Sequence, residues 1–333
     1  MREQLDHMCR KGPLWACLVA LGCLALGAPA AERMPKPRKI TPPTEQWVAK
    51  VRALAPAKPT VTPKAKRKVL VFSVATGYQH AVIPHVDRVL KVLADKSGAF
   101  APTFTTDVEM FSPEKIRPFD AVILQNTCSN NPKRDLFLDI VTGRGRGLTK
   151  KLSEKFKALS AEQKAARAAA LQKSLLDYVT AGGGLVGIHG AIVTFNTSEE
   201  FGRAMGAHFS YHPRSQELTL TPAEPDHPLL KAFGGEPFIH TDECYMMKGK
   251  AYTARNFRPM LTIESKKVQG VRKNTDAILY ASWIKKYGKG RVFYVSPSHY
   301  PESYHSTVLL RYYLDGIQYA TGDLACNDSP VKK

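Results

Sequence analysis

The sequence lacks the motifs that bind nucleotides and the cysteine pairs that bind structural zinc. Its 333 residues contain no P-loop, no complete G-x-G-x-x-G fingerprint and no recognisable nucleic-acid-binding module. It has no C-x-x-C pair, and three of its six cysteines lie in the first 30 residues, which leaves Cys128, Cys244 and Cys326 widely spaced. We therefore expect no nucleotide cofactor and scattered free thiols, with one long-range disulfide as the alternative.

Acidic residues are scarce, and the resulting positive charge is unevenly distributed. There are 48 Lys and Arg residues against 29 Asp and Glu residues, which gives a net charge of +19 at pH 7. Residues 31–68 contain eleven basic and two acidic residues and so carry about half of this excess. Because the charge is concentrated in a Pro-rich segment, we expect no specific nucleic-acid partner. Binding of a polyanion through residues 31–66 is the alternative that the charge leaves open.

No apolar run is long enough to span a bilayer comfortably as a permanent helix. The run over residues 14–26 follows Arg10 and Lys11 and precedes Ala28-Pro29-Ala30, a small-residue cleavage site. This pattern predicts a signal peptide over residues 1–30 and a protein that is exported, either periplasmic or secreted. An alternative is cleavage before Cys23 as a lipoprotein, and the protein would be held at a membrane only if it were lipidated there.

Composition divides the rest of the chain into three parts. Residues 31–67 are rich in Pro, Ala and Lys, which indicates a leader or linker, or an arm over the domain surface, with a short helix at 45–54. An α/β domain is predicted over residues 68–323 and a C-terminal tail over 324–333. The sequence does not indicate an oligomeric state.

Strand and helix patterns alternate from Lys68 onward. The run KVLVFSV is apolar throughout, as in a parallel strand that is buried on both faces. Further strands are predicted at 102–106, 119–125 and 185–189, with helices at 82–94 and 160–180, a helical turn after Ser112-Pro113 and a polar, cationic excursion at 131–163. The order indicates an α/β fold, a flavodoxin-like, doubly wound, mostly parallel sheet with helices on both faces.

The C-terminal half adds short strands with a different arrangement. Strands are predicted at 217–221, 258–265, 276–283 and 290–296, followed by an amphipathic helix at 306–320. We expect this half of the chain to add an antiparallel portion to the sheet, with the last strand ending at the same edge as the parallel strands.

Reactive side chains follow the predicted parallel strands. His80 follows the first strand, Asn126 and Cys128 the third, His189 the fourth and His299 the last. Ligands bind at the carboxyl ends of the strands in such sheets, so these side chains are expected at one edge. Imidazole suits acid–base catalysis or metal binding near neutral pH.

The segment GLVGIHG has the pattern of a nucleophile elbow, in which a tight turn after a strand exposes one side chain. That side chain is His189, a poor acyl nucleophile compared with Ser or Cys. Hydrolysis by an ordinary catalytic triad is therefore disfavoured, and a metal ligand or a general base fits better.

A series of motifs over residues 67–323 resembles the ThuA-like (trehalose utilisation) family, which has the class I glutamine-amidotransferase-like fold. The motifs are TGYQHAVIP, FDAVILQNT, GGGLVGIHGA, DHPLL, HTDECY and GKGRVFYVSPSHYPESYHSTVLLRYYLDGIQYATG. The resemblance places family motif positions on Thr76, Gly77, His80, His189, Asp242, Glu243, Tyr245 and His299. Ser298 stands where the family usually has glycine, and His299 with Glu302 resembles the His and Glu of the amidotransferase triad. Since His189 replaces the nucleophilic cysteine, glutamine hydrolysis is not expected.

The resemblance implies a carbohydrate-processing protein that acts on a disaccharide, a glycoside or its 3-keto derivative, and its partner would be a small carbohydrate. We assign catalytic roles to His189, His299 and Glu243, and the same three residues could hold a divalent metal, with zinc as the default. Substrate contacts are assigned to Tyr78, His80, Asn126, Tyr245 and Tyr300, and Tyr304 is a further candidate for stacking on a sugar. His208 and His212 are expected to be solvated, with a place in the lining of the pocket as the alternative, and His227 is expected to organise a turn. The alternative function is a non-catalytic sugar-binding or envelope-interaction module.

Overall fold

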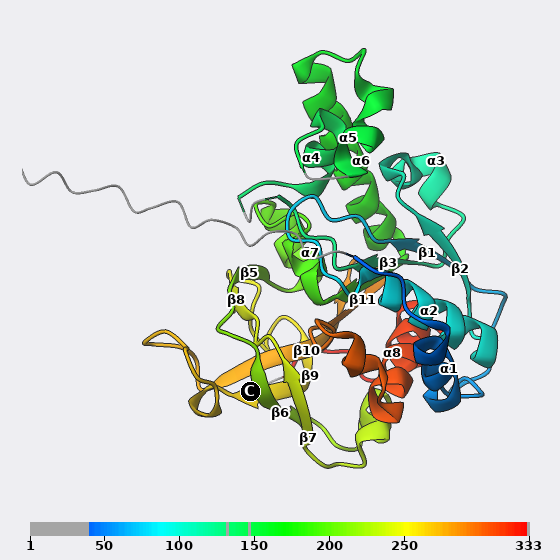
Figure 1. Cartoon of the computed structure of the whole chain (residues 1–333). Coiled ribbons are helices and arrows are strands. Elements are labelled where there is room, and N and C mark those ends of the chain that lie inside the picture. Colours follow the sequence, from blue (N-terminus) through cyan, green and yellow to red (C-terminus); the bar gives the residue numbers. More distant parts are fainter. Residues whose placement is uncertain (1–39, 131–132, 146–147, 332–333) are drawn as a thin grey trace, which may run out of the picture. The chain divides into compact units, whose positions relative to one another are not determined.

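Five parallel strands form one side of the nine-stranded main sheet. β1 (Lys68–Phe72) is the predicted apolar strand, and it lies between β2 (Ala101–Thr105) and β3 (Ala121–Gln125). β4 (Gly184–Ile188) and β11 (Gly290–Val295) complete the order β2-β1-β3-β4-β11 (Figure 1). This is the 2-1-3-4-5 order of a flavodoxin-like sheet, so the predicted fold class is confirmed.

The structure is a computed structural model that describes residues 40–130, 133–145 and 148–331. The predicted signal peptide over residues 1–30, Cys23 and the first part of the leader lie outside these residues. No helix of the described part is long and apolar enough to cross a membrane. Cys128, Cys244 and Cys326 are free thiols, as expected.

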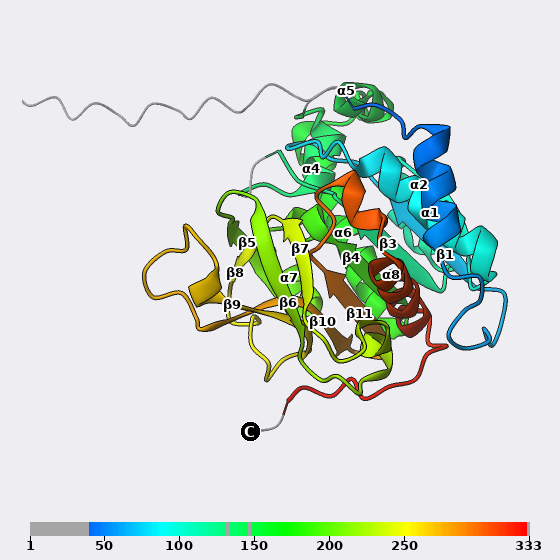
Figure 2. The same ribbon diagram turned by 60° about the horizontal axis from the view of Figure 1, so that its bottom comes forward.

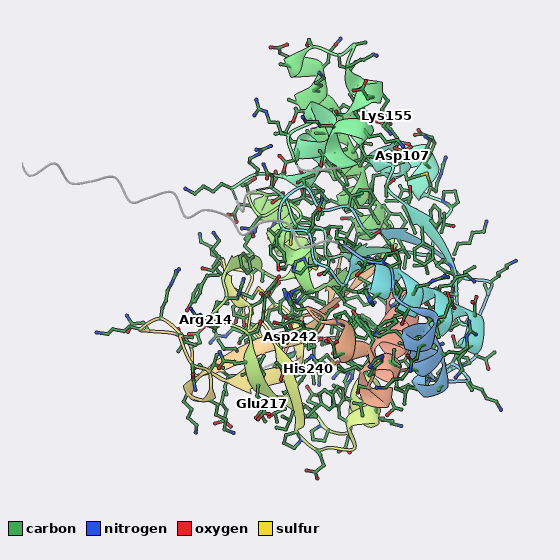
Figure 3. The ribbon with its side chains drawn as sticks, viewed as in Figure 1. Asp107, Lys155, Arg214, Glu217, His240 and Asp242 are labelled. Carbon is green, nitrogen blue, oxygen red and sulfur yellow. The ribbon has the colours of Figure 1, made fainter. Side chains whose placement is uncertain are left out.

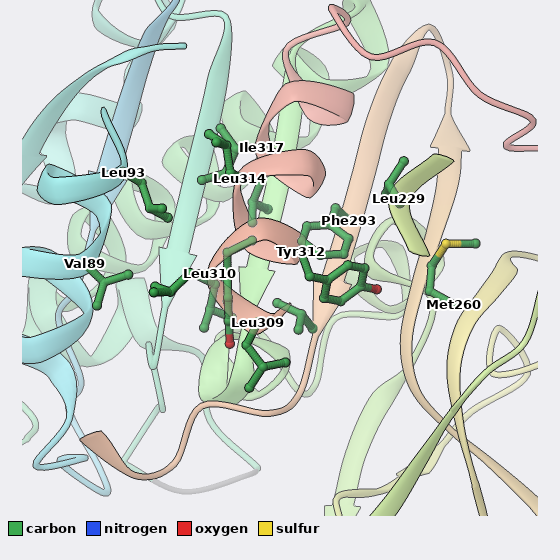
Figure 4. Close-up of a cluster of buried hydrophobic side chains, with 14 of the residues drawn as sticks. Val89, Leu93, Leu229, Met260, Phe293, Leu309, Leu310, Tyr312, Leu314 and Ile317 are labelled. Carbon is green, nitrogen blue, oxygen red and sulfur yellow. The ribbon is translucent and has the colours of Figure 1, made fainter. Parts of the chain in front are cut away.

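Alternate side chains of β1 enter two separate hydrophobic cores. Val69 and Val71 pack into the core that contains α2 (Ile83–Ser97) and α8 (Thr307–Ala320), and Figure 4 shows how α8 fills that space. Leu70 and Phe72 pack into the other core, on the opposite face of the sheet. The uninterrupted apolar run of β1 therefore reflects burial on both faces.

The second core is formed by helices from the middle of the chain. They are α3 (Pro113–Ile116), α4 (Leu136–Thr142), α6 (Ala161–Ala181) and α7 (Glu199–Met205). The predicted polar excursion contributes α4, α5 (Leu148–Ser153) and the short 3-10 helix η2 (Glu154–Phe156). α6 begins at a capping box between Ser160 and Gln163 and ends at Gly182, close to the predicted bounds.

Four antiparallel strands continue the main sheet beyond β11. Their order is β10 (Ile278–Tyr287), β9 (Arg258–Glu264), β6 (Gln216–Pro222) and β7 (Phe238–Asp242), so β7 is an edge strand. A separate pair consists of β5 (His208–Tyr211) and β8 (Met246–Lys248). β5, β7 and β8 were not predicted from the sequence, whereas β6, β9, β10 and β11 were.

The described part of the leader lies on the domain as an arm. α1 (Glu45–Leu54) has the predicted bounds and packs beside α2 (Figure 2), where Val51 is completely buried. The chain then crosses α8, where the Thr60 hydroxyl donates to Asp315 over 2.5 Å and the Gln318 amide donates to the Val61 carbonyl over 2.6 Å. Residues 44–67 therefore extend the packed structure beyond the predicted domain start.

The carboxyl group of Asp315 is buried beneath this arm, and we expect it to make the stability of the protein depend on pH. Burial raises the pKa of Asp315 from 3.8 to about 6, because the hydrogen bond from Thr60 only partly offsets the desolvation. The folded state then binds the proton more tightly than the unfolded state, so stability is lost as pH rises from about 4 to 6. We expect the unfolding free energy of wild type to fall relative to Asp315→Asn between pH 4 and 7, by at most about 3 kcal/mol.

Urea unfolding of both proteins at pH 4 and pH 7 measures this difference. Thr60→Val is the matched control, because it removes the hydroxyl donor while the carboxyl group remains. A stability gap between wild type and Asp315→Asn that is the same at both pH values would contradict the assignment.

Candidate functional site

Four side chains from separate segments meet at the carboxyl ends of the parallel strands. His80 follows β1, His189 follows β4, His299 follows β11 and Glu243 follows β7. One ligand atom from each lies within 4.8 Å of the ligand atoms of the others. The predicted convergence of strand-end histidines is therefore present, and Glu243 supplies a carboxylate among them. We call these four residues the His–Glu cluster.

His189 sits on a strained turn, as its elbow-like sequence suggested. Its φ is +49°, in the left-handed region that a residue with a β-carbon rarely adopts. The next residue must be small, because a β-carbon on Gly190 would lie 2.6 Å from Cys128 Sγ and 3.1 Å from His80 Cε1. The turn therefore packs tightly against the end of β3 and the His80 loop, and strain of this kind is concentrated at functional sites.

Hydrogen bonds fix the orientation of the His189 ring. Its Nδ1 lies 2.7 Å from the carbonyl oxygen of Ser296, which can only accept, so Nδ1 carries a proton and donates. In the neutral ring Nε2 then has a free lone pair. Nε2 lies 3.4 Å from Glu243 Oε2 and 3.3 Å from His299 Nδ1. Metal-binding histidines usually have such a donor contact to a carbonyl or carboxylate.

Glu243 connects the imidazoles through its two oxygens. Oε2 also lies 3.1 Å from His299 Nδ1, and Oε1 lies 3.5 Å from Nδ1 of His212. The carboxylate therefore faces three histidines at once. The ion pair of His299 among the described residues is with Glu243, whereas no pair with Glu302, the acidic residue of the triad-like segment, is present there.

The pKa values within the His–Glu cluster shift in different directions. Burial alone would raise the pKa of Glu243, but hydrogen bonds to His189 and His299 outweigh it and hold that pKa well below its usual range. Burial opposes ionisation of His189, yet the contact with Glu243 raises the pKa of that imidazole. Burial and the neighbouring imidazoles lower the pKa of His80, which is therefore neutral. A carboxylate among three buried imidazoles therefore favours a positive charge at the cluster.

Asp242 ties together the two turns that carry Glu243 and His299. Its Oδ2 accepts the backbone N–H groups of Ser298 and His299 at 2.8 and 3.2 Å, and its Oδ1 accepts the N–H of Glu243 at 2.7 Å. Oδ2 also lies 3.1 Å from Nε2 of His240. Because Asp242 is 1% exposed, these contacts satisfy a buried carboxylate and position both cluster residues.

Most of the predicted substrate-contact residues surround the His–Glu cluster. The Tyr245 ring centroid lies 4.4 Å from that of His189, and the Tyr300 ring centroid lies 4.6 Å from that of His299. Tyr78 is 37% exposed and its ring lies against those of His80 and His299, so it covers the cluster from outside.

Asn126 is fully buried at the end of β3, with a φ of +53°. Its backbone N–H donates to the Ile188 carbonyl beside the elbow, and its Oδ1 has no hydrogen-bond partner among the described residues. A second strained residue with an unsatisfied acceptor therefore adjoins His189.

One histidine prediction and one tyrosine prediction were wrong. His212 is exposed, as expected, and it also contacts Glu243 and stacks on the Tyr245 ring. His208 was expected to be solvated but is buried, where it packs on Gly202 and Gly249 and not in the His–Glu cluster. Tyr304 is fully buried, with its hydroxyl paired to Ser298, and it cannot contact a sugar. His227 caps the 3-10 helix η4 (Pro228–Phe233), as predicted.

Cys128 lies beside the His–Glu cluster but is not an activated nucleophile. Its Sγ is 3.9 Å from His80 Nδ1, and burial raises the pKa of the thiol above its usual range. We expect Cys128 to react with iodoacetamide only as fast as the protein opens, because the buried thiol remains protonated. Mass spectrometry of alkylated peptides measures the rate of modification, with Cys326 as the partly exposed comparison. Rapid modification of Cys128 in the folded protein would contradict this assignment.

The geometry of the His–Glu cluster fits a tetrahedral metal ion. Bonds of roughly 2.0–2.1 Å to zinc place neighbouring ligand atoms roughly 3.3 Å apart. The three distances between His189 Nε2, His299 Nδ1 and Glu243 Oε2 are 3.3, 3.4 and 3.1 Å. His80 is the fourth residue within reach. Two or three imidazoles with one carboxylate form a donor set typical of zinc and related divalent ions.

The flavodoxin-like sheet and the histidine at the elbow define an α/β protein with its candidate site at the carboxyl ends of the parallel strands. The family model described as ThuA, trehalose utilisation, matches residues 68–320, so this chain belongs to the ThuA-like family. The membership indicates a function related to carbohydrate use. No curated protein matches the sequence.

Solved structures of ThuA-like proteins share this fold. One from Bacteroides uniformis has a TM-score of 0.57 at 17% identity, and the match covers 78% of this chain and 93% of that one. One from Parabacteroides merdae has a TM-score of 0.51 at 18% identity, covering 80% and 98%. At these identities the similarity shows the fold alone.

Proposed function

We propose that this protein is an exported carbohydrate-processing enzyme that acts on a disaccharide, a glycoside or its 3-keto derivative. The observation that carries the proposal is the close approach of His189 Nε2, His299 Nδ1 and Glu243 Oε2, at 3.1–3.4 Å from one another in a buried site. The carbohydrate class follows from the family.

The His–Glu cluster can move protons without any further group. Glu243 is an ionised carboxylate that stabilises a protonated imidazole, and His189 is an imidazole whose raised pKa suits it to take up and hold a proton. Hydrolysis, elimination and isomerisation of a keto sugar each need a proton removed beside a carbonyl or delivered to a leaving oxygen. An imidazole that is oriented by a carboxylate can serve as the acid or the base in such a step.

A divalent metal would be held by His189, His299 and Glu243, with His80 as the fourth residue of the set. Such an ion supplies Lewis acidity, which polarises a carbonyl or lowers the pKa of water. His212 lies outside this set, 3.5 Å from Glu243 Oε1, and its side chain is 38% exposed, so it connects the carboxylate with the surface of the protein.

The proposal is tested by following trehalose and 3-ketotrehalose by NMR with three preparations: the purified protein, the protein after chelator treatment, and the protein with zinc restored. We expect turnover by the zinc-restored protein and its loss in a His189→Asn variant that remains folded. Sugar that binds but stays unchanged in all preparations would overturn catalysis and favour a sugar-binding module. Separation of envelope and cytoplasmic fractions, with and without residues 1–30, tests export.

A further inference from the structure

A cleft lies next to the His–Glu cluster along the free edge of the sheet. It has a volume of about 390 Å³ and is lined by Ile239, His240, Thr241, Tyr300, Glu302 and Ser303. This volume falls within the range of small-molecule sites, roughly 300–1,000 Å³. Figure 3 shows His240 and Asp242 side by side on β7, the strand that borders the cleft.

Three successive residues of β7, at positions 239, 240 and 241, line the cleft. Their arrangement shows where the cleft lies relative to the strand. Neighbouring side chains of a strand point to opposite faces, so a cleft that touches residues 239, 240 and 241 must run along the strand edge. β7 is the last strand of the sheet and pairs only with β6. Alternate backbone N–H and C=O groups of an edge strand point away from the partner strand and can bind a ligand.

The remaining walls of the cleft combine apolar and hydroxyl-binding surfaces. Ile239 is 55% exposed, an unusual exposure for a large aliphatic side chain, and Tyr300 contributes an aromatic ring. Thr241, Ser303 and Glu302 contribute two hydroxyl groups and a carboxylate. A sugar ring presents the matching surfaces, an apolar C–H face and a rim of hydroxyl groups.

The cleft shares two of its walls with the surroundings of the His–Glu cluster. The Tyr300 ring packs against the His299 ring, and Tyr300 also lines the cleft. His240 contacts both Asp242, at 3.1 Å, and Ser303, at 3.2 Å. A ligand that occupies the cleft therefore lies beside residues that contact the cluster or its support, Asp242.

We propose that this cleft is a second sugar-binding subsite, so that the substrate has at least two rings: one at the His–Glu cluster and one between Ile239 and Tyr300. This inference rests on the proposed function and names its substrate class as a disaccharide or a longer glycoside. A peptide strand is a poorer occupant, because the cleft meets only three residues of β7, roughly 10 Å of strand.

Calorimetric binding of trehalose, maltose, cellobiose and methyl α-glucoside tests the subsite. We expect wild type to bind at least one disaccharide about tenfold more tightly than methyl α-glucoside. Ile239→Arg should remove this preference while affinity for methyl α-glucoside stays unchanged. Ile278→Arg, at another exposed strand position (42% exposed), is the matched control and should behave as wild type.

The possible results separate the subsite proposal from the proposed catalytic function. A disaccharide preference that survives Ile239→Arg, or equal affinity for one ring and two, would overturn the subsite alone. Binding of the disaccharide at the cleft without any turnover would overturn the proposed catalysis and keep the subsite. Failure of all four sugars to bind would overturn both.

Discussion

Replacing His189 with asparagine is expected to lower zinc affinity by at least about 100-fold. Loss of a partner that only orients a metal ligand typically costs 10–100-fold, and His189 would be a ligand itself. Asparagine is the suitable replacement because it tolerates the left-handed backbone at φ +49° better than most residues. The variant should therefore remain folded, with a loss confined to the site.

Competition with a chromophoric chelator measures the zinc affinity, and circular dichroism checks the fold. His227→Asn is the matched control. It also exchanges a buried histidine for asparagine, but at a helix cap, where asparagine is itself a good capping residue. Zinc affinity that is equal in wild type and His189→Asn would show that the His–Glu cluster does not bind this metal. An equal loss in His227→Asn would point to a general effect on folding.

Asp242→Asn is expected to lower zinc affinity by about 10–100-fold although Asp242 is outside the proposed ligand set. Its Oδ2 has three donor partners and its Oδ1 has one, the N–H of Glu243. An asparagine would keep its oxygen toward the three donors and turn its NH₂ group toward the Glu243 N–H. Glu243 would then lose its backbone anchor, and a buried N–H would be left unpaired.

The same change should reduce the free energy of unfolding by about 2–3 kcal/mol, because hydrogen bonds to a buried charge are lost. Metal titration at a temperature where the variant is fully folded separates the positioning role from the loss of stability. Asp226→Asn, an exposed acid in the loop before η4, serves as the control. Reduced stability with unchanged metal affinity would contradict the positioning role.

The central part of the fold was predictable because its strands are buried on both faces. β1 and β3 are apolar at nearly every position, and a strand, a helix and a strand in succession admit few arrangements. β5, β7 and β8 have only four, five and three residues, and their exposed positions interrupt any apolar pattern. Their existence depends on pairing with distant strands, which local sequence does not encode.

The same distinction applies to the candidate site. His80, His189 and His299 could be placed together because each follows a parallel strand, and strand ends of one direction share an edge. The contact of His212 with Glu243 could not be predicted, because His212 follows β5, whose position depends on the pairing with β8. The contact of His299 with Glu243 also depends on tertiary structure, because Asp242 draws the 298–299 turn toward Glu243.

The docked arm has a consequence for where the folded unit begins. The family match starts at residue 68, yet Val51, Thr60 and Arg67 already pack or bond with α2, α8 and Asp323. A chain shortened to the family boundary would leave the carboxylate of Asp323 without its guanidinium and the apolar surface of α2 in water. The packed structure therefore begins before the region that the family model matches. A recombinant protein intended for biochemistry needs to begin before Thr44 to keep these contacts.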